Sequence, residues 1–132
     1  MMWCKGKKLN NIGIYFDKLA KKNKNNVAIK FDKREKYTFH FLNELSNKFL
    51  VYFDSIGLKE NDLIALESKK NIFSYAIIIA ALKKGITYSF FDSNESEKRI
   101  NLILEKLKPK KTFLFENKKG YIKSNFISDG LL

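Results

Sequence analysis

The feature that most constrains this sequence is an apolar run, IFSYAIIIAAL, from Ile72 to Leu82. It has about half of the roughly 20 residues that a membrane-spanning helix needs, so the sequence predicts a buried helix instead. Asn71 can cap the start of this helix, and Gly85 can end it. Because apolar side chains surround the whole helix, we expect it to be covered on more than one side.

Short segments typical of strands lie on both sides of this helix. A further amphipathic helix is expected at residues 97–107, capped by Ser93 or Ser96 and ended before Pro109. Strands that alternate with helices are typical of a parallel sheet, because parallel neighbours need a long crossover connection. We therefore predict an α/β fold with a mainly parallel sheet and crossover helices. The expected strands are residues 63–67, 87–91, 112–115 and 121–127.

The first part of the sequence predicts two more helices and a hairpin. Apolar residues recur every three or four positions from Ile12 to Ala20, as in an amphipathic helix. Residues 27–31 alternate apolar and polar side chains before a turn at residues 32–35. Thr38 is a good N-cap for a second helix, which Gly57 ends. The residues expected to face the core from this helix are Leu42, Leu45, Phe49, Leu50 and Phe53.

The charge of the chain raises the question of a polyanionic partner. The chain has 132 residues, enough for one domain, and a formal net charge of +12. Only Arg34 and Arg99 among its 26 basic residues are arginines, whereas base readout and bidentate phosphate contacts favour the guanidinium group. The lysines are dispersed between polar residues. We therefore interpret most of them as solvated surface, and nucleic-acid binding is disfavoured.

Cys4 and His40 are the single cysteine and the single histidine of the chain. One cysteine can form no intrachain disulfide, and neither residue has a catalytic partner near it in the sequence. We expect Cys4 to be incidental and His40 to lie at a helix start or in packing. The first residues, MMWCKGKKLNN, show no export signal, so the expected location is cytoplasmic.

Four segments resemble the beginning of the adenylate-forming (AMP-binding) enzymes, which include acyl-CoA synthetases and the amino-acid adenylation domains of nonribosomal peptide synthetases. LKKGITYSFFD is similar to the family motif LKAGxAYVPLD, and YTFHFLNELSNKFL is similar to LTYxEL and the helix that follows it. GLKENDLIALES resembles GVxxGDxVAxxLP, and SNESEKRINLILEKLKPKKTFLFE resembles PSYPAERLxYMLEDAxPxxLLT. The matching residues are Thr38, Phe39, Leu42, Asn47, Gly57, Asp62, Leu82, Lys83, Gly85, Tyr88, Asp92, Arg99, Leu104 and Pro109.

The resemblance covers residues 14 to 116 and is not complete. Prolines of the family motifs are missing at three positions, which removes rigidity from the loop around Asp92. The substituted positions are Phe90, Ser93 and Ser96, together with Phe41 in place of a usual glutamate. The expected organisation is a flexible N-terminus at 1–11, an N-terminal subdomain at 12–116, and a turn with a further strand at 117–132.

The resemblance implies a scaffold role for these motifs. In the family the glycine ends a helix, the tyrosine packs and the aspartate fixes a loop, so Leu82 to Asp92 is expected to be a structural joint. The complete enzymes join a carboxylate to ATP with magnesium, and their Ser, Thr and Gly-rich phosphate loop and catalytic lysine follow later in the sequence. The glycines of this chain are scattered singly. We therefore expect a truncated N-terminal portion of an AMP-dependent ligase that is inactive alone and has no catalytic, cofactor-binding or metal-binding residues of its own.

The expected partner is the remainder of the adenylation domain or a downstream polypeptide. Sheet edges left unpaired would also lead to self-association. Two alternatives stay open at this point. One is a noncatalytic interaction module that binds through a sheet edge or the apolar helix, and the other is a basic nucleic-acid-binding protein.

Overall fold

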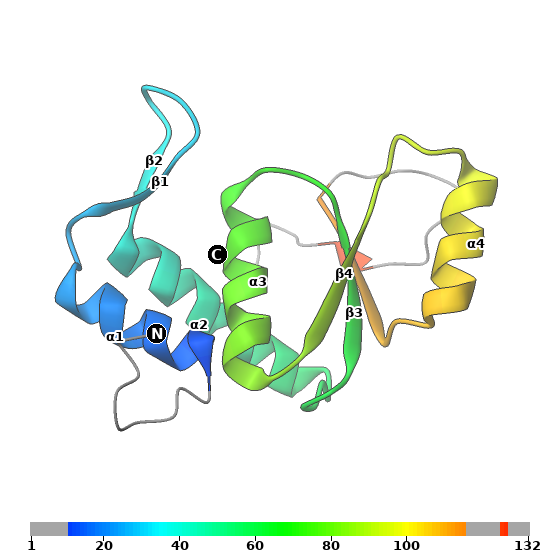
Figure 1. Cartoon of the computed structure of the whole chain (residues 1–132), viewed down its shortest axis with the longest axis horizontal. Helices are drawn as coiled ribbons and strands as arrows, with labels where there is room; N and C mark the ends of the chain where they lie inside the picture. Colours follow the sequence, from blue (N-terminus) through cyan, green and yellow to red (C-terminus); the bar gives the residue numbers. More distant parts are fainter. Residues whose placement is uncertain (1–10, 116–124, 127–132) are drawn as a thin grey trace, which may run out of the picture.

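The computed structural model describes residues 11–115 and 125–126 of the chain (Figure 1). Its elements, in chain order, are α1 (Ile12–Lys22), β1 (Val27–Lys30), β2 (Lys36–Thr38), α2 (Phe39–Ser55), β3 (Leu63–Glu67), α3 (Ile72–Lys84), β4 (Thr87–Phe91), α4 (Glu97–Leu107), β5 (Lys111–Leu114) and β6 (Asn125–Phe126). Within the described residues, each predicted helix and strand is present. The expected N-terminus at 1–11 and the segment at 117–132 lie almost wholly outside these residues, so the predicted domain boundaries stay a prediction.

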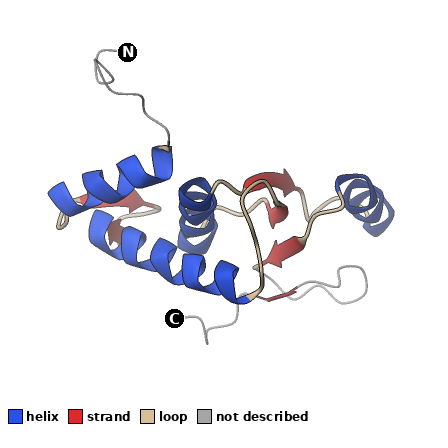
Figure 2. Cartoon of the chain, turned by 90° about the horizontal axis from the view of Figure 1, so that it is seen from below, coloured by secondary structure: helices blue, strands red, loops and turns tan. Residues whose placement is uncertain are grey.

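The main sheet is parallel and has the strand order β4-β3-β5-β6, which confirms the predicted α/β class. The chain moves from β3 to one neighbour, β4, and then crosses back over β3 to the other neighbour, β5. Because crossovers are right-handed, this reversal of direction places the two connecting helices on opposite faces. Figures 1 and 2 show α3 on one side of the strands and α4 on the other.

Helix caps fix where the elements begin and end. The Asn71 side chain accepts a hydrogen bond from the Ser74 N–H at 2.8 Å, and Gly85 ends α3 in the left-handed conformation with φ 77°. The α4 cap is Ser96, whose hydroxyl accepts from the Arg99 N–H at 3.2 Å. Ser93, the other predicted cap, is a buried residue of the preceding loop.

The core has two parts, one on each face of the sheet. The larger part joins α2 and α3 to β3 and β5, and the smaller part lies under α4 around Ile100 and Phe91. The apolar α3 is covered as predicted, because α1 and α2 pack on it and β4 lies on its other side. The fully buried residues of α2 and the strands include Phe49, Phe53, Ile64, Leu66 and Phe113.

A small antiparallel hairpin of β1 and β2 stands apart from the main sheet. Asp32 shapes its turn, because one carboxylate oxygen accepts from the N–H groups of Arg34 and Glu35 at 2.6 and 2.7 Å. These bonds hold the pKa of Asp32 below its usual value. Thr38 ends the hairpin and caps α2 by accepting from the Phe41 N–H at 3.1 Å.

Candidate functional site

The segment from Leu82 to Asp92, which is expected to be a structural joint, comprises the end of α3, the whole of β4 and the first residue of the loop before α4. Gly85 ends the helix with a φ of 77°, a backbone conformation that strains any residue with a side chain, and a Cβ there would also displace the Glu60 side chain, whose Cγ would lie 2.9 Å away. The Asp92 carboxylate accepts from the Asn94 N–H at 2.9 Å and so forms a turn with its own backbone. Both residues therefore shape the chain locally.

The most elaborate polar arrangement in the described residues is the lysine cluster, which we define as Lys83 with Asp17, Asn43, Ser46 and Asn47. The Lys83 ammonium donates to Asn43 Oδ1 at 2.6 Å, to Asn47 Oδ1 at 2.8 Å and to Ser46 Oγ at 3.0 Å. Its three protons are therefore all used. The carboxylate of Asp17 lies 3.8 Å away, and the Lys83 side chain is only 7% exposed. This geometry satisfies a buried charge and joins α1, α2 and α3.

The first helix approaches the same lysine through its backbone. A Cβ at Gly13 would lie only 2.3 Å from the backbone nitrogen of Lys83, so α1 can reach this position only with glycine. The Asn11 side-chain amide donates to the Lys83 carbonyl oxygen at 2.9 Å, and the Asn11 carboxamide oxygen accepts from the Ile14 N–H. Asn11 thus caps α1 and binds the end of α3 at once.

Burial and neighbouring groups alter the titration of the cluster. Burial lowers the pKa of Lys83 below its usual value, and the negative charge of Asp17 opposes this effect. The pKa of Asp17 is also lowered, first because the Asn43 amide donates to it at 2.9 Å and then because Lys21 pairs with it at 2.9 Å. The cluster is an ion pair with hydrogen-bonded amides, an arrangement suited to holding helices together.

Glu67 is the second buried charged side chain of interest, at the carboxyl end of β3. It is fully buried, and its Oε2 accepts from the Phe115 N–H at 2.7 Å. Its Oε1 has no hydrogen-bond partner among the described residues. One residue beyond Glu67, the backbone still pairs with β4, because the Ser68 N–H donates to the Phe91 carbonyl at 2.9 Å. The carboxylate therefore extends the contact between β3 and β5 where the two backbones separate.

The surface pockets offer little catalytic chemistry. A cavity of about 540 Å³ beside the start of α2 is lined by Thr38, Phe41, Leu45 and three other residues, among them His40. His40 lies at the helix start, as predicted, and is exposed. A smaller cavity of about 190 Å³ lies between α3 and β4. Cys4 lies outside the described residues.

Two observations on the described residues bear on a site for ATP with magnesium. They contain no group of three or more His, Cys, Asp or Glu side chains that could hold a metal ion. The start of α3 is next to Lys69 and Lys70, but its N-cap Asn71 already satisfies an N–H of the first turn. In the same part of the chain, no helix is long and apolar enough to cross a membrane.

The described residues thus form an α/β structural unit. It consists of a parallel sheet with helices on both faces, and buried polar groups join the helices and strands. A model of the family described as AMP-binding enzyme matches residues 16–127. Because the match spans most of the chain, the chain belongs to this family. The prediction made from the four segments is thereby confirmed. A search of curated proteins gives no match.

Solved structures share this fold. The N-terminal subdomain of Klebsiella oxytoca NpsA is 21% identical with a TM-score of 0.72, over 91% of this chain and 32% of that chain. NpsA with 3-hydroxyanthranilyl-AMSN is 21% identical with a TM-score of 0.77, over 94% and 26%. VinN with 3-methylaspartate is 14% identical with a TM-score of 0.74, over 81% and 30%. The chain therefore spans about a third or less of the length of these structures.

The sequence motifs contain two members of the lysine cluster, but the sequence did not show that these residues interact. Asn47 and Lys83 are matching residues of two different segments, and the structure brings them within 2.8 Å. The available signal was the position of Lys83 directly after the apolar run. Its acceptors Asn43 and Ser46 come from another helix, so the sequence could not show the interaction. Glu67 was missed as well, and the signal was a carboxylate at the end of the apolar strand LIALE.

Proposed function

We propose that the chain supplies a scaffold part of an AMP-dependent carboxylate ligase, one that adenylates an amino acid or an acyl group. We further propose that the chain has no adenylating activity by itself. Its family and its fold support the first statement. ATP and magnesium would then act on groups of the complete enzyme, and the remainder of the adenylation domain is the natural partner.

The main observation in favour of this proposal is that the Lys83 ammonium donates all of its hydrogen bonds within the chain. A lysine that serves a phosphate or an acyl group needs free protons on its ammonium, whereas Lys83 donates to three interior side chains. The other motif residues with a clear role, Gly85 and Asp92, form a helix end and a turn. These roles support a structural joint at Leu82 to Asp92, and the absence of catalytic residues stays a prediction.

The proposal is tested by ATP–pyrophosphate exchange with the purified chain and a panel of amino acids and fatty acids. We expect exchange no higher than without protein, while a complete adenylating enzyme in parallel shows that the assay works. Exchange by the chain that depends on one acid would refute the proposal. If the polypeptide encoded directly downstream carries a phosphate loop, we expect the two to co-purify and to show exchange only together.

A noncatalytic interaction module is the second candidate function, and the outer edge of β4 favours it. No strand of the described chain pairs with this edge. An interaction module would be folded and stable in isolation and would bind a partner without exchange activity. Nucleic-acid binding has no comparable observation in its favour among the described residues.

A further inference from the structure

The last strand on one side of the main sheet is β4, and its backbone shows which groups face outwards. The Thr87 N–H donates to the Asp62 carbonyl at 2.8 Å, and the Phe91 carbonyl accepts from the Ser68 N–H at 2.9 Å. Both groups therefore face β3. Because the peptide groups of successive residues alternate between the two edges of a strand, Tyr88 and Phe90 direct their N–H and C=O groups to the outer edge.

Among the described residues, this outer edge has none of the usual forms of protection against strand pairing. Proteins commonly block an edge with a lysine, a proline, a bulge or a very short strand. The strand TYSFF has no charge and no proline, and its register with β3 is regular over all of its residues. No strand of the described chain covers it. It is therefore open to pairing with another polypeptide.

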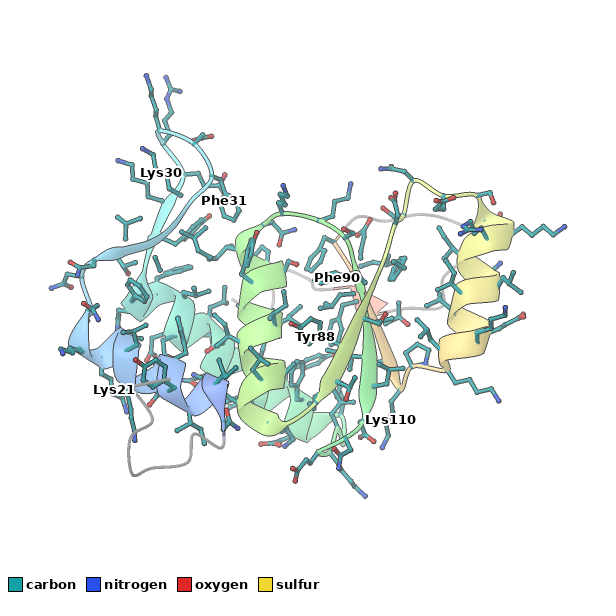
Figure 3. The ribbon with its side chains drawn as sticks, in the orientation of Figure 1. Lys21, Lys30, Phe31, Tyr88, Phe90 and Lys110 are labelled. Carbon is teal, nitrogen blue, oxygen red and sulfur yellow. The ribbon has the colours of Figure 1, made fainter. Side chains whose placement is uncertain are left out.

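Two aromatic side chains, those of Tyr88 and Phe90, lie along this edge. Tyr88 and Phe90 lie on the side of β4 that faces α3 (Figure 3), with ring centroids 5.8 Å apart at 76°. Phe90 is 47% exposed and lines the cavity of about 190 Å³ together with Tyr75 and Ile78. An incoming strand could therefore pair with the backbone and place an aromatic ring against Phe90.

A second copy of the same strand fits this edge in one register. If two β4 strands pair antiparallel about a two-fold axis beside Ser89, Tyr88 of each copy lies opposite Phe90 of the other. These are the two residues whose backbone groups face outwards, so each pair exchanges both of its hydrogen bonds. Each pair also places a tyrosine opposite a phenylalanine on the same face, a favourable cross-strand combination.

Charges at the two ends of the strand agree with this register. Lys70 lines the cavity next to Phe90, at the end of β4. Glu60 lies against Gly85, just before the start of β4. Antiparallel pairing brings the end of one strand to the start of the other, so Lys70 approaches Glu60 of the second copy. The formal net charge of +12 on each copy opposes the pairing at long range.

We propose that the outer edge of β4 is a docking surface for a second copy of this chain, with Tyr88 paired to Phe90 across a two-fold axis. The sequence led us to expect self-association through an unpaired sheet edge, and we assign that edge to β4. It rests on the sheet topology and not on the proposed enzyme, so a result in the exchange assay leaves it unaffected.

Sedimentation velocity of the purified chain, over a range of concentrations and at low and high salt, tests the proposal. We expect a monomer–dimer equilibrium that high salt strengthens, because salt screens the repulsion between two basic copies. Phe90→Pro removes the N–H that faces outwards and leaves the hydrogen bonds to β3 intact, so an edge strand can accept this proline. It removes a hydrogen bond from each pair and should weaken the dimer about tenfold or more.

Three further variants separate the contributions. Phe90→Ala keeps the N–H and loses the ring, so its dimer should be weaker than that of the parent and stronger than that of Phe90→Pro. Phe90→Lys adds a charge to the edge and should abolish the dimer. Val51→Lys is the matched control, because Val51 is 71% exposed and lies on α2, a helix that is not part of the sheet edge. It adds the same charge and should leave the dimer intact.

Circular dichroism checks that each variant folds, and Phe90→Lys decides the outcome if Phe90→Pro does not fold. A chain that stays monomeric at every concentration and salt would overturn the proposal. So would a dimer with the same dissociation constant in Phe90→Lys and in the parent, since another surface would then hold it. A dimer that weakens as salt rises would also contradict it.

Discussion

Replacement of Lys83 by methionine tests the role of the lysine cluster. Methionine keeps the apolar stem and a similar helix propensity, and it removes only the ammonium group. Three charge-assisted hydrogen bonds of 2.6 to 3.0 Å are lost. Each such bond contributes a net stabilisation of about 1.5–3 kcal/mol. Asn43 keeps its bond to Asp17, and Ser46 keeps its bond to the Asn43 carbonyl, so these bonds do not add to the loss. The contributions of bonds within one network are also not additive. We expect a decrease of about 3–4 kcal/mol in the free energy of unfolding, as for other buried charged networks that lose one member.

Urea-induced unfolding followed by far-ultraviolet circular dichroism measures this effect, and Lys84→Met is the matched control. Lys84 is the next residue of the same helix and pairs with Asp54, whose side chain is 65% exposed. Loss of such a surface pair should cost about 0–1 kcal/mol. A Lys83→Met variant as stable as Lys84→Met would refute the argument that the buried ammonium joins the three helices.

Three further predictions concern neighbouring groups. Gly13→Ala should destabilise the chain by about 1–3 kcal/mol in urea unfolding, because the new methyl group overpacks against the Lys83 backbone. A gain of about 0.5–1 kcal/mol, which is usual when alanine replaces glycine inside a helix, would contradict this prediction. Asp17 has a folded-state pKa below the usual 3.8, so its stabilising contribution is present above that pH and is lost as the pH falls through the folded-state pKa. Asp17→Asn should therefore be less stable than the parent at neutral pH and approach it in acid, and a stability difference that does not change with pH would count against this. Glu67→Ala should cost about 1–3 kcal/mol because the part-buried Phe115 N–H loses its acceptor. Glu67→Gln should stay closer to the parent in stability, and equal losses in the two variants would show that the hydrogen bond is unimportant.

Local signals in the sequence were sufficient for the secondary structure and the class of fold. Thr38 and Asn71 cap helices, and Gly85 ends one, through bonds that each residue makes with its own neighbourhood. The residue types at these positions therefore carry the information directly. The alternation of strands and helices then leaves a parallel sheet as the natural arrangement, because each connection is long enough for a crossover.

Interactions between distant segments could not be predicted in the same way. Asn43, Ser46 and Lys83 look like ordinary polar positions of two separate helices, and only the packing of those helices brings them together. The choice of Ser96 over Ser93 as a cap depends on how the loop before α4 is buried. The tight approach of Gly13 to α3 likewise depends on tertiary structure.

We infer that the polar groups of this chain hold a scaffold together and that nucleotide binding belongs to other parts of a complete enzyme. Calorimetric titration of the purified chain with magnesium-ATP tests it most directly, because binding, unlike exchange, can be measured without knowing which acid is activated. The titration is made at moderate salt, with inorganic pyrophosphate as a control, since a basic chain attracts anions in general. We expect no saturable binding of ATP beyond that of pyrophosphate. Saturable binding of one ATP per chain, with pyrophosphate much weaker, would contradict the account.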